Sequence, residues 1–192
     1  MNSDLILIEN FISSEQEKQL IDFIDSKDNT WNNLLKRRTM HFGYEYNYHQ
    51  SGTLRETKPI PKEFNEIIDL VGKQLNKYVE NQPINQVIIN EYLPGQGISP
   101  HIDANSFGDV IVSLSLGSDA VMEFTNITMT STKKVNILLK RCSVIFLTKD
   151  TRYKWRHSIP ARKTDKLDDG TKIERGRRIS MTFRHVLGKM IN

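Results

Sequence analysis

The sequence is poor in the residues that cross-link a chain or carry it through a membrane. Its single cysteine, Cys142, excludes an internal disulfide and a cysteine-rich zinc site, and it fits a reducing compartment. The longest apolar runs, such as Val110–Leu116, are as long as a strand and far too short to span a bilayer. No basic region followed by a long apolar stretch opens the chain, so we expect no secretion signal. We therefore expect a cytoplasmic protein, with the nucleus as the alternative, and no membrane partner.

The sequence also lacks a large excess of charge of either sign. The 192 residues include 27 Lys and Arg against 23 Asp and Glu, a net charge of only +4. The basic residues nevertheless cluster at Lys36–Arg38, Lys133–Lys134, Arg162–Lys163 and Arg175–Arg178. Such patches suit a polyanion such as nucleic acid, although a solvated surface is the alternative reading. The length and the absence of linkers predict one domain over residues 1–192.

The first half of the chain has two helical patterns. Ser14 and Glu17 have capping-box spacing, which predicts a helix from there to about Ser26. A second helix is predicted to begin near Pro61, with one apolar stripe. The stripe consists of Phe64, Ile67, Ile68, Val71, Leu75 and Tyr78.

The second half has the short apolar runs that are typical of strands. They lie at Val87–Tyr92, Val110–Leu116, Val121–Thr125, Val135–Leu139, Ser143–Leu147 and Ile179–Val186. Two helices followed by many short strands predict an α+β fold with a sandwich or jelly-roll core. Residues 161–177 are polar throughout, and we expect a long loop there, of the kind that forms lids or mobile segments.

The last predicted strand alternates in an unusual way. Its period of two puts Arg178, Ser180, Thr182 and Arg184 on one face and Ile179, Met181 and Phe183 on the other. Two arginines on the inner wall of a barrel would be costly without an anionic partner, so they indicate a bound carboxylate or phosphate. An edge strand with one solvated face is the alternative. The same period places Ile88, Asn90 and Tyr92 on one face of an earlier strand.

The tripeptide His101-Ile102-Asp103 can supply two metal ligands, because residues two apart on an extended segment point the same way. A second histidine from a distant strand would complete a 2-His-1-carboxylate set, which leaves open positions on Fe(II) for a 2-oxo acid and dioxygen. A zinc hydrolase is the alternative use of such ligands. We select His157 as the third ligand. His41, His49 and His185 are the competing candidates.

Four stretches of the chain resemble the AlkB family of oxygenases, and they occur in the family's order over nearly its whole length. They are INEYLPGQGISPHID, IVSLSLGSDAVMEF, RYKWRHSIPARK and RRISMTFRHV. The resemblance implies a double-stranded β-helix core with N-terminal helices packed outside. It also implies an Fe(II) enzyme that uses 2-oxoglutarate and dioxygen as cosubstrates and releases succinate.

The resemblance assigns roles to individual residues. The family's iron ligands correspond to His101, Asp103 and His157, which form the expected catalytic centre. The N-x-Y motif of the family corresponds to Asn90 and Tyr92, which are expected to contact 2-oxoglutarate.

The two arginines of the family's last motif correspond to Arg178 and Arg184. Arg178 is expected to bind the distal carboxylate of 2-oxoglutarate through its planar fork, and Arg184 to lie beside Asp103 near the iron. Asn105 stands where several nucleic-acid-repair members have an acid that reads the damaged base. A neutral amide there is expected to contact substrate and argues against a repair role; a loop position without such a role is the alternative.

Within the family, the stretch LKRRTMHFGYEYNY is most similar to the AlkB homologue that hydroxylates a modified wobble uridine in tRNA. That homologue has an RNA-recognition domain before its oxygenase domain and a methyltransferase domain after it. These 192 residues match neither, nor do they contain the cysteines of its zinc site. The resemblance implies nucleic acid as the partner, RNA (tRNA) before DNA, and leaves room for a separate methyltransferase partner.

Residues 30–55 are rich in aromatic and basic residues and unlike a core element, and we interpret them as an insert that covers the substrate. Phe42, Tyr44, Tyr46 and Tyr48 are expected to stack on a base, and Arg37 and Arg38 are expected to hold phosphates. Packing of these aromatics on the second helix is the alternative. The competing functions are an oxidative demethylase that repairs alkylated bases and, in a different class, a nucleic-acid-binding module without turnover.

Overall fold

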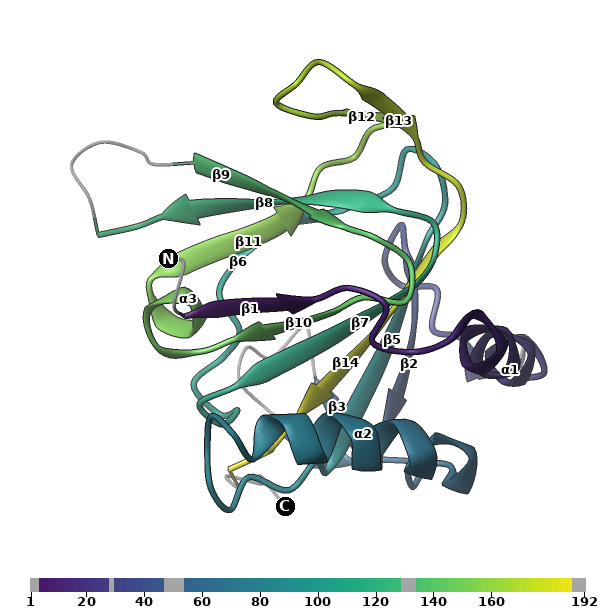
Figure 1. The fold of residues 1–192 in the computed structure, drawn as a ribbon. Coiled ribbons are helices and arrows are strands. Elements are labelled where there is room, and N and C mark those ends of the chain that lie inside the picture. The colour runs from purple at the N-terminus through teal and green to yellow at the C-terminus, as the bar shows by residue number, and fades with distance from the viewer. Residues whose placement is uncertain (1–3, 28–29, 47–53, 129–133, 188–192) are drawn as a thin grey trace.

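A computed structural model describes residues 4–27, 30–46, 54–128 and 134–187, apart from the side chain of Tyr46. Two antiparallel sheets face each other, and helices α1 and α2 lie on the side of the larger sheet that is turned away from the smaller one (Figure 1). This arrangement confirms the predicted jelly-roll core with helices packed outside. Within the described residues, no helix is long and apolar enough to cross a membrane.

The larger sheet has six strands and the smaller sheet has four. The larger sheet runs in the order β1 (Leu5–Ile8), β10 (Val144–Leu147), β7 (Ile111–Gly117), β14 (Arg178–Arg184), β5 (Gln86–Tyr92), β2 (Arg38–Phe42). The smaller sheet runs β6 (Ile98–His101), β11 (Trp155–Ile159), β8 (Ala120–Asn126), β9 (Lys134–Leu139). All six predicted strands are present. β14 lies in the middle of its sheet, so the alternative of a solvated edge strand is wrong.

Apolar side chains fill two layers. Met181, Phe183 and Ile179 project from β14 into a cluster shared with α1 and α2. The opposite face of the larger sheet meets the smaller sheet over a second cluster that includes Phe124 and Trp155. The polar face of β14 therefore looks between the two sheets rather than into solvent.

Helix α1 (Ser14–Asp25) begins one residue earlier than its predicted cap implies. The N-cap is Ser13, whose Oγ accepts the backbone N–H of Gln16 at 3.1 Å, while the Gln16 side chain accepts the N–H of Ser13 at 2.9 Å. The predicted Ser14–Glu17 capping box is thus wrong. Glu17 is buried instead, where it accepts the N–H of Gly117 at 2.8 Å and pairs with Arg141.

The second helical segment starts as predicted, with the 3-10 turn η2 (Lys62–Phe64) followed by α2 (Asn65–Leu75). Phe64, Ile67, Val71 and Leu75 are buried. Tyr78 lies beyond the end of the helix and is partly exposed, with its ring 5.5 Å from that of Phe146.

Part of the expected insert, residues 30–55, belongs to the core. Strand β2 pairs with β5 in register, Met40 against Ile89, and Met40 and Phe42 are buried. Phe42 packs edge-on against Phe64, so for this aromatic the alternative of packing on the second helical segment is the correct one. The short strands β3 (Tyr44–Tyr46) and β4 (Leu54–Glu56) form a separate hairpin.

The polar stretch 161–177 is a hairpin, not an irregular loop. Strands β12 (Thr164–Lys166) and β13 (Lys172–Glu174) project from the smaller sheet (Figure 1). The base of the hairpin is fixed by the completely buried Asp165, which accepts Arg175 at 2.6 Å and 2.7 Å and the N–H of Val121 at 2.9 Å. A further short helix, α3 (Lys149–Tyr153), leads into β11.

Candidate functional site

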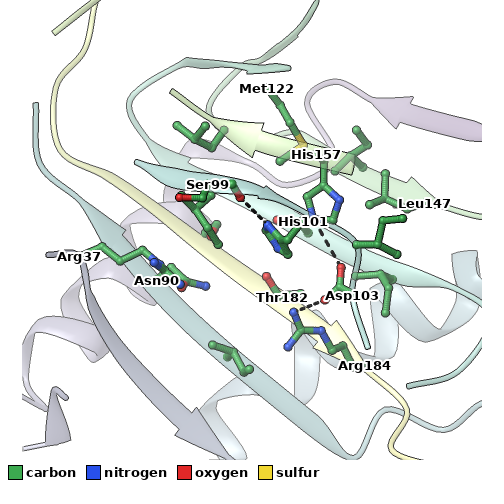
Figure 2. A pocket seen from close by; sticks show the side chains of 18 of the residues that line it. Arg37, Asn90, Ser99, His101, Asp103, Met122, Leu147, His157, Thr182 and Arg184 are labelled. Carbon is green, nitrogen blue, oxygen red and sulfur yellow. Dashed lines mark hydrogen bonds and ion pairs between the residues drawn. The ribbon is translucent and has the colours of Figure 1, made fainter. Parts of the chain in front are cut away.

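A cavity of about 400 Å³ lies between the two sheets. Arg178, Ser180, Thr182 and Arg184 line it from β14, and Ile88, Asn90 and Tyr92 line it from β5. The face assignments made from the two-residue period are therefore confirmed for both strands. On the opposite wall the cavity reaches β6 and β11 of the smaller sheet (Figure 2).

Three side chains converge on one point of this cavity. His101 ends β6, Asp103 follows it in the loop, and His157 lies on β11 directly opposite His101 in the antiparallel register. One ligand atom from each of the three lies within 4.8 Å of the others. The ring centroids of the two histidines are 4.4 Å apart. The sequence prediction that H-x-D and a late histidine meet is confirmed as geometry.

The surroundings of the two imidazoles decide which ring nitrogen each can offer to a metal. His101 Nδ1 lies 2.8 Å from the carbonyl oxygen of Ser99, an acceptor only, so Nδ1 carries the proton and Nε2 is left for a metal (Figure 2). Burial lowers the pKa of His157 to about 4, against the opposing pull of Asp103. The 3.4 Å approach of His157 Nε2 to Asp103 Oδ2 is thus a contact between two potential ligands rather than an ion pair.

Asp103 is a buried carboxylate that stays ionised. Burial acts most strongly and would raise its pKa, but the basic groups around it, Arg184 foremost, together outweigh burial and hold the pKa well below its usual range. Arg184 donates from Nη2 to Asp103 Oδ1, and its guanidinium lies 4.5 Å from the ring centroid of Phe107. Two imidazoles and one carboxylate are the donors of a 2-His-1-carboxylate site for Fe(II).

Arg178 is a buried cation in need of an anion. It is 3% exposed, donates from Nη2 to Ser115 Oγ at 2.8 Å and lies over the ring of Tyr92. Its Nε has no hydrogen-bond partner, and among the described residues no carboxylate pairs with it. Burial lowers the pKa of Arg178, although arginine remains charged. An uncompensated guanidinium of this kind fits one end of a dicarboxylate bound in the cavity.

Asn90 and Arg37 meet at the cavity wall. Arg37 lies just before β2, lines the cavity and donates from Nε to Asn90 Oδ1 at 3.0 Å (Figure 2). Because the amide oxygen is occupied, the Asn90 NH₂ group is the part that remains for a ligand.

The remaining candidate ligands lie apart from this centre. His41 is on β2, with its pKa lowered to about 4 mainly by burial, and its Nε2 is 3.2 Å from Thr39 Oγ1. His185 contacts the carbonyl oxygen of Pro83 through Nδ1 at 2.8 Å. His49 lies outside the described residues. The choice of His157 over His41 and His185 agrees with the geometry.

The predicted substrate-binding residues are placed less favourably. Arg38 pairs with Glu91 and stacks on Trp31, so the structure gives it a partner other than phosphate. Tyr44 packs against the apolar cluster between the sheets, and Asn105 is exposed on a turn; neither lines the cavity. Only the backbone of Tyr46, in β3, is described, and Tyr48 lies outside the described residues. Substrate contact by these residues stays a prediction.

One residue of the site escaped sequence reasoning. The Arg152 side chain is buried beneath the loop that carries Asp103 and donates to backbone carbonyls of that loop. No motif marks it, because its partners are main-chain atoms that every residue possesses.

Residues 4–184 match a family model that is described as "2OG-Fe(II) oxygenase superfamily". The chain is a member of the 2OG-Fe(II) oxygenase superfamily. Within it, the chain is an AlkB-type oxygenase: it is 38% identical over 95% of its length to mouse "tRNA (carboxymethyluridine(34)-5-O)-methyltransferase ALKBH8". It spans only 30% of the length of that protein.

Two further similarities support the assignment. An uncharacterized protein of Acanthamoeba polyphaga mimivirus, L905, is 35% identical over 96% of this oxygenase and is covered over 86% of its own length. The solved structure entitled "The structure of OsALKBH1" has 16% identity and a TM-score of 0.70, with 95% of this chain and 96% of that chain covered. That structural match shows the fold alone.

Fe(II) and 2-oxoglutarate fit the residues of this AlkB-type oxygenase. The metal would be held by His101, Asp103 and His157, and the distal carboxylate of 2-oxoglutarate by Arg178. The unpartnered Nε of the buried Arg178 is the observation in this structure that calls for such an anion.

Proposed function

We propose that this oxygenase oxidises a modified nucleobase in RNA and hydroxylates the side chain of a wobble uridine in tRNA. The proposal is carried by the 38% identity, over 95% of this chain, to a mouse protein that is named for a carboxymethylated uridine at tRNA position 34. The relative's name describes a methyltransferase, and this chain spans only 30% of that protein, so hydroxylation of the uridine is our inference for this chain.

The residues of the site divide the work in a way that supports an oxidation. His101, Asp103 and His157 line the cavity and would hold Fe(II) there with three protein ligands, a set that allows a cosubstrate to bind the metal as well. Bound Fe(II) would activate dioxygen, the oxidant, while 2-oxoglutarate is converted to succinate and CO2, so that one oxygen atom enters succinate and the other the substrate. Arg178 orients the cosubstrate, and Arg184 keeps Asp103 ionised. The apolar lining, including Ile111, Met122 and Leu147, keeps water away from the reacting centre.

The substrate would approach past Arg37, which lies at the cavity wall and is half-buried. A guanidinium at this place can contact a phosphate or another anionic group of a nucleotide while its Nε stays bonded to Asn90. Arg37 is thus the predicted substrate-binding residue that the geometry favours, whereas Arg38 is paired with Glu91.

The test is mass spectrometry of nucleosides from tRNA incubated with the native enzyme or with Asp103→Ala. We expect a hydroxylated uridine, heavier by one oxygen, with the native protein only. Asp103→Ala should also abolish 2-oxoglutarate turnover, because it removes one of three metal ligands, while its circular dichroism spectrum stays native. Release of formaldehyde from methylated oligonucleotides, without the hydroxylated uridine, would instead make the enzyme a demethylase. Turnover of 2-oxoglutarate by Asp103→Ala at the native rate would refute the metal site.

A further inference from the structure

Arg152 has an unusual environment for a charged side chain. It is 2% exposed and lies on α3, five residues before the ligand His157. Its guanidinium donates to the carbonyl oxygens of Asp103 at 2.8 Å, Ala104 at 2.7 Å and Gly108 at 3.2 Å. Within the described part of the chain, no carboxylate pairs with it through an ion pair. The hydrogen bonds that it makes to described residues all go to the main chain of residues 103–108.

A buried guanidinium without an anion is costly, and the cost has to be offset by what it holds. Burial lowers the pKa of Arg152, while the carboxylate of Asp103 is the main charge that opposes this. Carbonyl dipoles satisfy the donors but do not neutralise the charge. A neutral side chain could fill the same space at lower cost if packing were the whole requirement.

The loop that Arg152 holds is the one that carries the iron ligand. Asp103 is bound at two points: its main-chain carbonyl accepts Arg152, and its carboxylate accepts Arg184. Arg184 in turn stacks on Phe107, which belongs to the same loop. Arg152 and Arg184 thus hold the loop from its main-chain and its side-chain sides.

The two arginines have opposite consequences for a metal. Arg184 attracts the carboxylate of Asp103 toward itself and so competes with a cation at the same group. Asp103 Oδ2 nevertheless remains 3.4 Å from His157 Nε2, within reach of the shared point. With its carbonyl fixed by Arg152, the Asp103 main chain cannot follow the carboxylate toward Arg184.

We propose that Arg152 is a positioning residue for the metal centre: it fixes the main chain of residues 103–108, so that Asp103 is aimed at the two histidines before the metal binds. The proposal rests on the iron site of the proposed function but not on the identity of the RNA substrate. Residues of this kind, which orient ligands without touching the metal, change metal affinity about 10–100-fold when they are replaced.

The experiment measures Mn(II) affinity by calorimetry for the native protein, Arg152→Met, Arg152→Lys and Tyr153→Phe, well below the unfolding temperature of each. Tyr153→Phe is the matched control, because its hydroxyl donates to Asp109 Oδ1 at 2.6 Å and tethers the exposed end of the same loop. We expect Arg152→Met to weaken Mn(II) binding about 10–100-fold. Arg152→Lys, which keeps the charge but reaches fewer carbonyls, should fall between, and Tyr153→Phe should bind as the native protein does.

A second readout separates positioning from mere stability. The visible absorption of Fe(II) chelated by 2-oxoglutarate, recorded without oxygen at saturating metal, should be shifted in Arg152→Lys and unchanged in Tyr153→Phe. If Arg152→Met does not fold, Arg152→Lys decides the question through the same two measurements. Native Mn(II) affinity together with a native absorption band in a folded Arg152 variant would overturn the proposal. If the native protein binds Mn(II) but does not modify tRNA, this result would count against the proposed function and not against the role of Arg152.

Discussion

Arg175 and Arg178 are three residues apart, and both are buried, but their surroundings differ in kind. Arg175 is held at the base of the β12–β13 hairpin by both oxygens of Asp165, at 2.6 Å and 2.7 Å, and donates to the carbonyl oxygen of Pro160. Arg178 faces the cavity; within the part of the chain that the structure describes, it has one hydrogen bond, to Ser115, and an unpartnered Nε. One cation is neutralised within the chain, and the other requires a ligand.

The presence or absence of a carboxylate partner distinguishes a structural arginine from a ligand-binding one better than burial does, because both arginines are buried. A complete buried ion pair fixes one segment to another, and removal of either member leaves an uncompensated charge. A buried cation without an anionic partner marks a place where the protein binds an anion that it does not itself supply. The neighbours Arg38 and Arg37 repeat the contrast: Arg38 is paired with Glu91, whereas the partner of Arg37 among the described residues is the neutral amide of Asn90.

Replacement of Asp165 with Ala should have the largest effect on the fold. It leaves the buried Arg175 without its anion and the Val121 N–H without an acceptor, so the free energy of unfolding should fall by about 3–5 kcal/mol. Asp168→Ala, at an exposed acid of the same hairpin, should change it by less than about 0.5 kcal/mol. Urea unfolding measures both. Equal effects of the two substitutions would mean that the Asp165–Arg175 pair does not fix the hairpin.

Replacement of Arg178 with Met should act on the ligand and not on the fold. The affinity of the Mn(II)-loaded protein for 2-oxoglutarate should fall by about 2–5 kcal/mol, because a buried charge pair with the ligand is lost. Arg178→Lys keeps the charge but not the planar fork, so its loss should be smaller. The free energy of unfolding of the ligand-free protein should stay level or rise in Arg178→Met. A loss of stability as large as that in Asp165→Ala would erase the contrast between the two arginines.

The pH dependence of stability sharpens the same contrast at a smaller scale. Burial acts to raise the pKa of Asp165, but hydrogen bonds from Arg175, Val121 and Arg162 outweigh it, and the pKa is lowered. The stabilisation is therefore complete above the unfolded-state pKa of about 3.9 and is lost as the pH falls through the lower pKa of the folded state. The difference in unfolding free energy between the native protein and Asp165→Asn should be level above about pH 5 and should shrink as the pH falls below about 4. A difference that is constant over this range would assign the effect to packing.

Much of the fold and the metal centre could be predicted because the relevant signals are local. The runs that became β5, β7 and β14 are apolar enough to read directly, and the alternation around Arg178 and Arg184 fixed which face meets the cavity. The H-x-D spacing was sufficient to bring two ligands to one side of a chain segment.

The failures have equally specific causes. Ser13 with Gln16 and Ser14 with Glu17 show the same capping pattern one residue apart, and only the burial of Glu17 distinguishes them. Because β2 also contains polar residues, its sequence did not indicate a core strand, although Met40 is buried. The partner of Arg38 depends on the register of β2 with β5, which juxtaposes Arg38 and Glu91 and which no local pattern prescribes.

The smallest effects are expected at Arg37 and Arg38. These adjacent residues carry the same positive charge, but only one of them is expected to contact RNA. If Arg37 contacts a phosphate of the bound RNA, Arg37→Ala should lower the slope of log affinity against log salt concentration by about 0.7–0.9, the release of one counterion. Arg38→Ala should leave that slope unchanged and instead lower the free energy of unfolding by about 1 kcal/mol, because Glu91 then keeps only Arg177. A salt titration of tRNA binding by the three proteins, beside their urea unfolding, measures both quantities.

A change in slope for Arg38→Ala and none for Arg37→Ala would reverse the assignment. Identical slopes for all three would leave Arg37 as a residue that holds the Asn90 amide, and would remove residues 37 and 38 from the RNA-binding surface.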